Sequence, residues 1–335
     1  MKRSIVFSIA MLCALPSTAQ TGAPFVLQRS IELPGVMGKF DHFAIDISGH
    51  RLFVAATGNH SVEVIDLTSD KVLESVKGLG KPHGLVWVNS TGSLYVADGS
   101  LRELRLYQGE PLTLVGKIAL SDDADDMVYD QAEHLIFVGH GGTDAANPAK
   151  VAVVSTDPFS LIANLPVATH PEALEIDPQS QRVFANIAES NEVAVIGAKS
   201  KQIVAHWRLT KAADNVPLVF DADLHLLFVA CRTPAMLLAL DAASGKELTS
   251  AASAGQADDL FYDSALHRVY LISGGGEVDS YQVGAGDSLQ VLPAVHTASG
   301  AKTALFVQSQ NLLYVGVPGA TDRAGEVRVY KTNVQ

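Results

Sequence analysis

Leu52-Phe53-Val54 is the first of seven short apolar-aromatic segments that recur about every 44 residues along the chain. An Asp or a near equivalent usually stands about six residues earlier, as Asp46 and Asp130 do. A repeat of this length made only of short strands predicts a β-propeller, here with seven blades. The other six segments are Leu94-Tyr95-Val96, Ile136-Phe137-Val138, Val183-Phe184-Ala185, Leu227-Phe228-Val229, Val269-Tyr270-Leu271 and Leu313-Tyr314-Val315.

Each repeat contains four segments with strand patterns. An innermost strand precedes the Asp, as in residues 43–45, and the aromatic segment is the second strand. The third strand alternates apolar and polar residues, as in 62–65 and 193–196, and the fourth is more polar, as in 71–76 and 202–209. Period-two alternation with β-branched residues is typical of half-buried strands. Helical periodicity is absent, so the sequence predicts an all-β fold.

The two ends of the chain predict how the ring closes. After Lys302 the last repeat has only three strands, and residues 25–33 form a strand with no repeat of their own. We expect this N-terminal strand to complete the seventh blade, because closure removes an exposed sheet edge. Residues 20–335 are therefore expected to form a single seven-bladed domain.

Residues 1–19 have the pattern of an export signal. Lys2 and Arg3 provide a charged start, 5–15 an apolar run, and 17–19 a small-residue cleavage site. The apolar run is too short to span a bilayer. We therefore expect a periplasmic or secreted protein without a membrane span.

Composition narrows the range of partners. Removal of the signal leaves 22 of the 24 basic residues against 36 acidic ones, a net charge of −14. Nucleic-acid affinity depends on neutralising phosphates, so neither a nucleic acid nor an anionic membrane is expected as a partner. Only Cys231 remains after processing, so packing must stabilise the domain without an internal disulfide. A monomer that binds a small molecule or a protein is expected.

One stretch also carries a family resemblance. Residues 52–67 read LFVAATGNHSVEVIDL and are followed by Lys-Pro-His-Gly-Leu at 81–85, and 93–98 repeats the theme. This pattern resembles the YVTN-repeat propellers and extends over essentially the whole mature chain. The resemblance implies the fold, whereas the functions of such propellers are diverse. The turns at 233–235 and 274–276 depart most from the pattern.

Propellers bind ligands at the axial mouth, where loops enter the innermost strands. The residues eleven positions before each aromatic segment should meet there, and six of the seven are ionisable. The seven residues are Asp41, His83, Asp125, Glu172, Val216, Asp258 and Lys302, and Val216 is the one that is not ionisable. The next position adds His42, Asp126 and Asp259, and the chain leaving the aromatic segments adds Asp98 and His140.

Acidic and imidazole groups gather in blades 1 to 4. Crowded carboxylates favour a cation, and imidazole with carboxylate is the ligand set of Zn²⁺ or Mn²⁺. One divalent ion is therefore a candidate cofactor. The candidate metal ligands are His42, His83, Asp126 and His140, and the candidate proton acceptor is Asp98. The candidate ligand-binding residues are Asp41, Asp125, Glu172, Arg232, Asp258, Asp259 and Lys302, of which Arg232 and Lys302 suit an anionic group.

The sequence is compatible with two functions. The first is an exported binding or scaffolding module that holds a small ligand or a protein partner at the mouth. The alternative is a metal-dependent enzyme, resembling propeller lactonases, hydrolases or lyases, in which the mouth histidines with Asp126 or Glu172 hold the ion. Ordinary loop polarity is a third explanation, since His50 and His134 occur in turns without any site.

Overall fold

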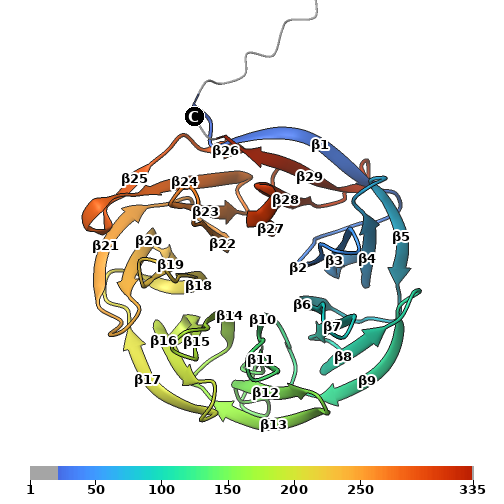
Figure 1. Ribbon diagram of the computed structural model, residues 1–335, viewed down its shortest axis with the longest axis horizontal. Coiled ribbons are helices and arrows are strands. Elements are labelled where there is room, and N and C mark those ends of the chain that lie inside the picture. Colours follow the sequence, from blue (N-terminus) through green and yellow to red (C-terminus); the bar gives the residue numbers. More distant parts are fainter. Residues whose placement is uncertain (1–21, 334–335) are drawn as a thin grey trace, which may run out of the picture.

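The computed structural model describes residues 22–333, so the predicted export signal at 1–19 lies outside the described residues. Seven antiparallel sheets are arranged in a ring around a central axis, which confirms the seven-bladed β-propeller (Figure 1). Within the described residues, no helix is long and apolar enough to cross a membrane. The helices described are four 3-10 turns, η1 (Thr57–Asn59), η2 (Ala188–Ser190), η3 (Ala285–Asp287) and η4 (Gln308–Gln310).

The strands of each blade follow one another from the central axis outward. Blade 1 contains β2 (Phe43–Asp46), β3 (Arg51–Ala56), β4 (Ser61–Asp66) and β5 (Lys71–Val76); blade 2 contains β6 (Pro82–Val88), β7 (Ser93–Asp98), β8 (Glu103–Gln108) and β9 (Thr113–Ala119). Blade 3 contains β10 (Met127–Asp130), β11 (Leu135–His140), β12 (Lys150–Thr156) and β13 (Phe159–Pro166); blade 4 contains β14 (Pro171–Asp177), β15 (Arg182–Ile187), β16 (Glu192–Gly197) and β17 (Gln202–Arg208).

Blades 5 to 7 complete the ring. Blade 5 contains β18 (Ala213–Asp221), β19 (Leu226–Thr233), β20 (Ala235–Asp241) and β21 (Glu247–Ala252); blade 6 contains β22 (Ala257–Asp263), β23 (Arg268–Ser273) and β24 (Glu277–Val283), with β25 (Leu289–Val291) and β26 (Val295–His296) both paired to β24. Blade 7 contains β27 (Ala304–Val307), β28 (Leu312–Val317), β29 (Gly325–Thr332) and β1 (Phe25–Leu33).

The N-terminal strand closes the ring as predicted. β1 pairs antiparallel with β29, from Phe25 opposite Thr332 to Leu33 opposite Gly325. This pairing places the first and last described strands in one sheet (Figure 1). It supplies the fourth strand of blade 7 and covers the outer edge of β29.

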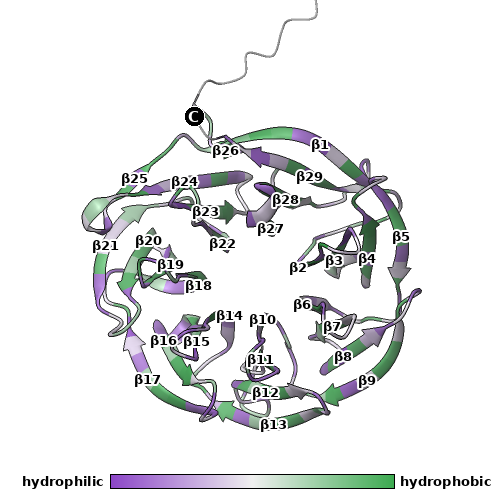
Figure 2. Cartoon of the chain, viewed as in Figure 1, coloured by the Kyte–Doolittle hydropathy of each residue, from purple (hydrophilic) through white to green (hydrophobic). Residues whose placement is uncertain are grey.

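The aromatic repeat forms the packing between blades. The aromatic residue of each second strand is at most 1% exposed, in the set Phe53, Tyr95, Phe137, Phe184, Phe228, Tyr270 and Tyr314. The third strands of blades 1, 3, 4 and 5 contain a continuous run of buried residues. Polar and apolar residues are mixed along the outermost strands β5 and β17 (Figure 2). Burial of an aromatic side chain stabilises the fold by roughly 1.5–3 kcal/mol. This stabilisation explains why an aromatic residue recurs in the second strand of every blade.

The repeated Asp holds the turn between the first and second strands. Asp46 accepts a hydrogen bond from the Gly49 amide at 2.9 Å, and Asp177, Asp221 and Asp263 accept amides in the same way. The residue before the second strand has a positive φ, for example 54° at His50 and 54° at His134. This backbone region favours Asn, Asp and His among non-glycine residues, which explains the histidines of these turns without a site.

Candidate functional site: the axial mouth

β-Bulges at the start of the innermost strands create the mouth. In blades 2, 4, 5 and 6 the pairing register shifts there, which leaves His83, Glu172, Val216 and Asp258 outside the regular ladder. Bulges re-aim side chains at the ends of strands. The residues predicted eleven positions before the aromatic segments are therefore those that the bulges direct out of the sheet.

In blades 1 and 3, two successive residues before the innermost strand pair with a single residue of the second strand. The Asp41 amide donates to Ala55 O, and the Ala55 amide donates to His42 O. Asp125 and Asp126 are related to Gly139 in the same manner. Each blade thus presents two adjacent polar side chains at the mouth.

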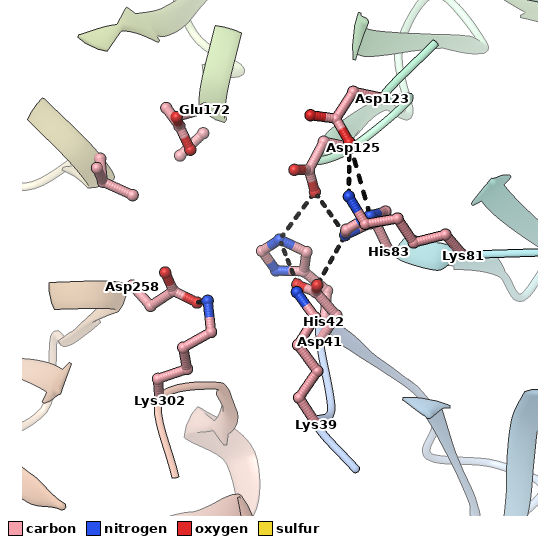
Figure 3. Close-up of a pocket in the computed structure, with 12 residues that line it drawn as sticks. Lys39, Asp41, His42, Lys81, His83, Asp123, Asp125, Glu172, Asp258 and Lys302 are labelled. Atoms are coloured by element: carbon pink, nitrogen blue, oxygen red, sulfur yellow. Dashed lines mark hydrogen bonds and ion pairs between the residues drawn. The ribbon is translucent and has the colours of Figure 1, made fainter. Parts of the chain in front are cut away.

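The mouth contains a cavity of about 160 Å³ with a mainly charged lining. Figure 3 shows the labelled side chains converging on it from all sides, with the His42 ring near the centre. The lining residues predicted from the sequence are Asp41, His42, His83, Asp125, Glu172, Val216, Asp258 and Lys302. Lys39, Lys81, Asp123 and Ala173 complete the lining.

Four carboxylates surround the imidazole of His42. Its Nε2 lies 3.6 Å from Asp41 Oδ1, 3.9 Å from Asp125 Oδ1 and 4.0 Å from Asp126 Oδ1. Its Nδ1 lies 3.6 Å from Asp259 Oδ1. Burial opposes charge on this imidazole, but the carboxylates outweigh burial and raise the pKa of His42 to about 10. The ring therefore serves as the cation of an acidic cluster.

Asp126 and Asp259 also connect neighbouring blades. Oδ2 of Asp126 accepts the Leu174 amide at 2.8 Å, and Oδ2 of Asp259 accepts the Ala304 amide at 2.7 Å. Burial raises the pKa of both carboxyls, to about 7 for Asp259, although the charge of His42 acts in the opposite direction. One oxygen of each carboxyl is thus fixed, and the other faces His42.

His83 orients Asp41. Its Nδ1 lies 2.7 Å from Asp41 Oδ2, and since an ionised carboxylate only accepts, Nδ1 carries the proton. Burial acts to raise the pKa of Asp41, but this hydrogen bond and the charge of His42 lower it. His83 is 3% exposed, and its buried Nε2 has no hydrogen-bond partner among residues 22–333.

Asp41, His42 and Asp125 form a group that could hold a metal ion. One ligand atom from each lies within 4.8 Å of the others. Ligands about 2.0–2.2 Å from one ion stand roughly 3–4 Å apart, and the His42 nitrogen meets this requirement with both carboxylates, at 3.6 and 3.9 Å. Asp259 on the far side of the His42 ring and His83 on Asp41 are placed as outer partners of such ligands.

The opposite wall of the mouth carries positive charge. Lys302 Nζ lies 2.6 Å from Asp258 Oδ2, and Arg232 Nη2 lies 2.9 Å from Asp258 Oδ1. Glu172 faces the cavity from blade 4, where burial raises its pKa and the charge of His170 partly offsets that effect. Negative groups around His42 thus face positive groups around Asp258.

Two sequence-predicted residues lie outside this cluster. Both ring nitrogens of His140 are engaged, since Nδ1 accepts the Ser121 amide and Nε2 contacts Asn164 Oδ1, each at 3.0 Å. The carboxylate of Asp98 accepts three backbone amides at 2.7 to 3.0 Å, those of Gly80, Lys81 and Leu101. These bonds stabilise loops, so we remove His140 from the candidate metal ligands and Asp98 from the candidate proton acceptors.

The structure adds His170, which the sequence analysis missed. Its Nδ1 donates to Gly141 O at 2.6 Å, and its Nε2 lies 3.8 Å from Asp125 Oδ2. Burial opposes protonation, but Asp125 and the Gly141 carbonyl raise the pKa of His170 to about 9. A sequence signal existed: Lys39, Lys81 and His170 each stand two residues before a mouth position.

The chain is thus a seven-bladed propeller with a charged axial mouth. It is similar in structure to hydrazine synthase of Kuenenia stuttgartiensis, with a TM-score of 0.77, 14% identity and coverage of 90% of this chain and 99% of that one. It is also similar to a chain of the Mitotic Checkpoint Complex, with a TM-score of 0.76, 13% identity and 99% coverage of each chain. No protein-family sequence model and no curated protein matches the chain. At these identities the similarity shows the fold alone.

Proposed function

We propose that this propeller is a binding module that holds a divalent metal ion at its axial mouth, with a small ligand beside the ion. Asp41, His42 and Asp125 provide the direct ligands. The observation that carries this proposal is the position of His42 Nε2, 3.6 Å from one ligand carboxylate and 3.9 Å from the other. Mixed imidazole and carboxylate donors suit Zn²⁺ or Mn²⁺.

Charge balance supports the same ligands. Four carboxylates surround one imidazole, so His42 supplies less positive charge than the cluster requires even when the ring is protonated. A divalent ion would satisfy this requirement and release the proton of His42, because metal ligands bind deprotonated. The outer contacts from His83 and Asp259 would orient Asp41 and His42.

Metal content of the mature protein tests this proposal. The protein is purified without chelator, incubated with Mn²⁺ or Zn²⁺, desalted and measured by elemental analysis. We expect about one ion per chain in the wild type and loss of that ion in Asp125→Asn. Asp221→Asn is the matched control, since Asp221 holds a turn of blade 5. Equal metal content in the wild type and in Asp125→Asn would contradict the proposed set of metal ligands.

A metal-dependent hydrolase or lyase is the second candidate, and Glu172 favours it. This carboxyl lines the cavity, and burial raises its pKa toward the range useful for proton transfer. A bound ion would supply Lewis acidity beside it. Turnover of esters or lactones by the metal-loaded protein, abolished in Glu172→Gln with metal content intact, would establish this activity.

Export to the periplasm or beyond the cell is part of the proposal. It rests on the charged, apolar and small-residue order of residues 1–19. Fractionation of the producing cells with N-terminal sequencing tests it. A mature N-terminus near residue 20 supports export, and an intact residue 1 in the cytosolic fraction contradicts it.

A further inference from the structure

The positive half of the mouth is not used by the metal site. Lys302 and Arg232 pair with the same carboxylate, Asp258, and Arg232 also interacts electrostatically with Glu172. Lys39 lines the same cavity, and its ammonium has no hydrogen bond or ion pair with any other residue of 22–333. Cationic groups beyond those that Asp258 neutralises are thus available to an anion.

The cavity also limits the size and polarity of its ligand. Its volume of about 160 Å³ is below the roughly 300–1,000 Å³ of pockets that hold drug-sized molecules. Ala173 and Val216 give an apolar wall between Glu172 and Asp258, and Val216 is buried. A short carbon skeleton fits this wall, whereas a longer chain would leave the cavity.

We propose that the ligand of the mouth is a small organic carboxylate. Its carboxylate group lies between the metal ion and the ammonium groups of Lys39 and Lys302, and its carbon skeleton lies against Ala173 and Val216. This inference rests on the proposed metal site, because without the ion the carboxylates of Asp41 and Asp125 would repel the ligand. A neutral amide or an amine of the same shape lacks the charge that the lysines recognise.

Calorimetric titration of three probes with the same four-carbon chain and different head groups tests the ligand class. Butyrate, butyramide and butylamine are titrated separately into the Mn²⁺-loaded protein. We expect butyrate to bind at least about tenfold more tightly than the other two, since hydrogen bonds to charged groups contribute about 1.5–3 kcal/mol. Lys39→Met and Lys302→Met should each weaken butyrate binding about tenfold or more on the same basis. Both variants should retain Mn²⁺, which shows that the site is folded.

Lys246→Met is the matched control, because exposed Lys246 lies in the loop between β20 and β21, away from the mouth. Butyrate affinity should be unchanged in it. Equal affinity for the three probes, or full affinity for butyrate in both mouth-lysine variants, would overturn the inference. Mn²⁺ affinity, measured first on every sample, separates the two claims: a wild type that binds Mn²⁺ but no butyrate contradicts only the ligand class. A wild type that binds no Mn²⁺ contradicts the metal site and, with it, this inference.

Discussion

Nδ1 of His42, in blade 1, lies 3.6 Å from Oδ1 of Asp259, in blade 6, so one imidazole spans the mouth of the propeller. Its other nitrogen faces Asp41, Asp125 and Asp126. His42 therefore connects blades that are distant in sequence, and it determines the charge of the whole cluster. The consequences can be measured at single residues.

Replacement of His42 by Gln should remove a proposed metal ligand and also the cation of the acidic cluster. Metal affinity should fall by at least about 100-fold, because loss of an outer partner alone costs about 10–100-fold. The free energy of unfolding of the metal-free variant should fall by about 3 kcal/mol at pH 7, as for other buried charges that lose a partner. Calorimetry with Mn²⁺ and urea unfolding measure the two effects. His206→Gln, at an exposed site on β17, should change neither.

Asp259 should act on the metal through His42. In Asp259→Asn the side-chain oxygen can still accept the Ala304 amide, but the negative charge beside His42 Nδ1 is lost. We expect metal affinity to fall about tenfold with little change in the unfolding midpoint. An unchanged affinity would show that Asp259 connects blades 6 and 7 without supporting a ligand.

Metal binding should strengthen as the pH rises. The pKa of His42 is raised to about 10, so at neutral pH the ion must displace a proton from the ring. Apparent affinity for Mn²⁺ should increase by up to about tenfold per pH unit between pH 6 and 9. Calorimetry in buffers of different ionisation enthalpy should detect the released proton. A Mn²⁺ affinity that does not change with pH would show that His42 is not a metal ligand.

The metal-free protein should show the opposite trend in stability. The pKa of His42 in the folded state lies above its ordinary value of 6.5. The stabilisation from its proton is therefore complete below about pH 6.5 and is lost as the pH rises toward 10. The pKa of Asp259 is raised from 3.8 to about 7. Its protonated carboxyl therefore also stabilises the folded state, and this stabilisation is lost as the pH rises toward 7. Thermal unfolding in EDTA should show a falling midpoint over this range, and saturation with Mn²⁺ should reduce the fall.

Asp98 should prove structural. Its carboxylate accepts three backbone amides, and the single oxygen of Asn cannot satisfy all of them. Asp98→Asn should lower the free energy of unfolding by about 2 kcal/mol, the cost of buried groups left unpaired. Mn²⁺ affinity should stay at the wild-type value. A selective loss of affinity in a stably folded variant would return Asp98 to the site.

Much of the mouth could be predicted because the repeat fixes its register. The residue eleven positions before each aromatic segment lines the mouth in all seven blades, and in blades 2, 4, 5 and 6 the pairing register shifts at that residue. Asp41, Glu172 and Asp258 were therefore placed at the mouth from counting alone. The strand over 25–33 and its closure of blade 7 also followed from the repeat, and both are confirmed.

The remaining features depend on side-chain geometry, which spacing does not specify. His140 stands at the end of a second strand, but its ring turns toward Ser121 and Asn164. His170 was missed because it lies before the bulge, in a segment that the strand pattern does not define. That His42 reaches Asp259 depends on how closely blades 1 and 6 approach each other, which is a property of the closed ring.

The position of a bound ion is the most direct measurement of the central claim. Crystals of the mature protein grown or soaked with Mn²⁺ would locate the ion by anomalous scattering. The account predicts one strong peak within about 2.0–2.3 Å of His42 Nε2 and of a carboxylate oxygen from each of Asp41 and Asp125. Crystals with no anomalous peak at the mouth under saturating Mn²⁺, or a peak only at the outer face of the blades, would contradict it.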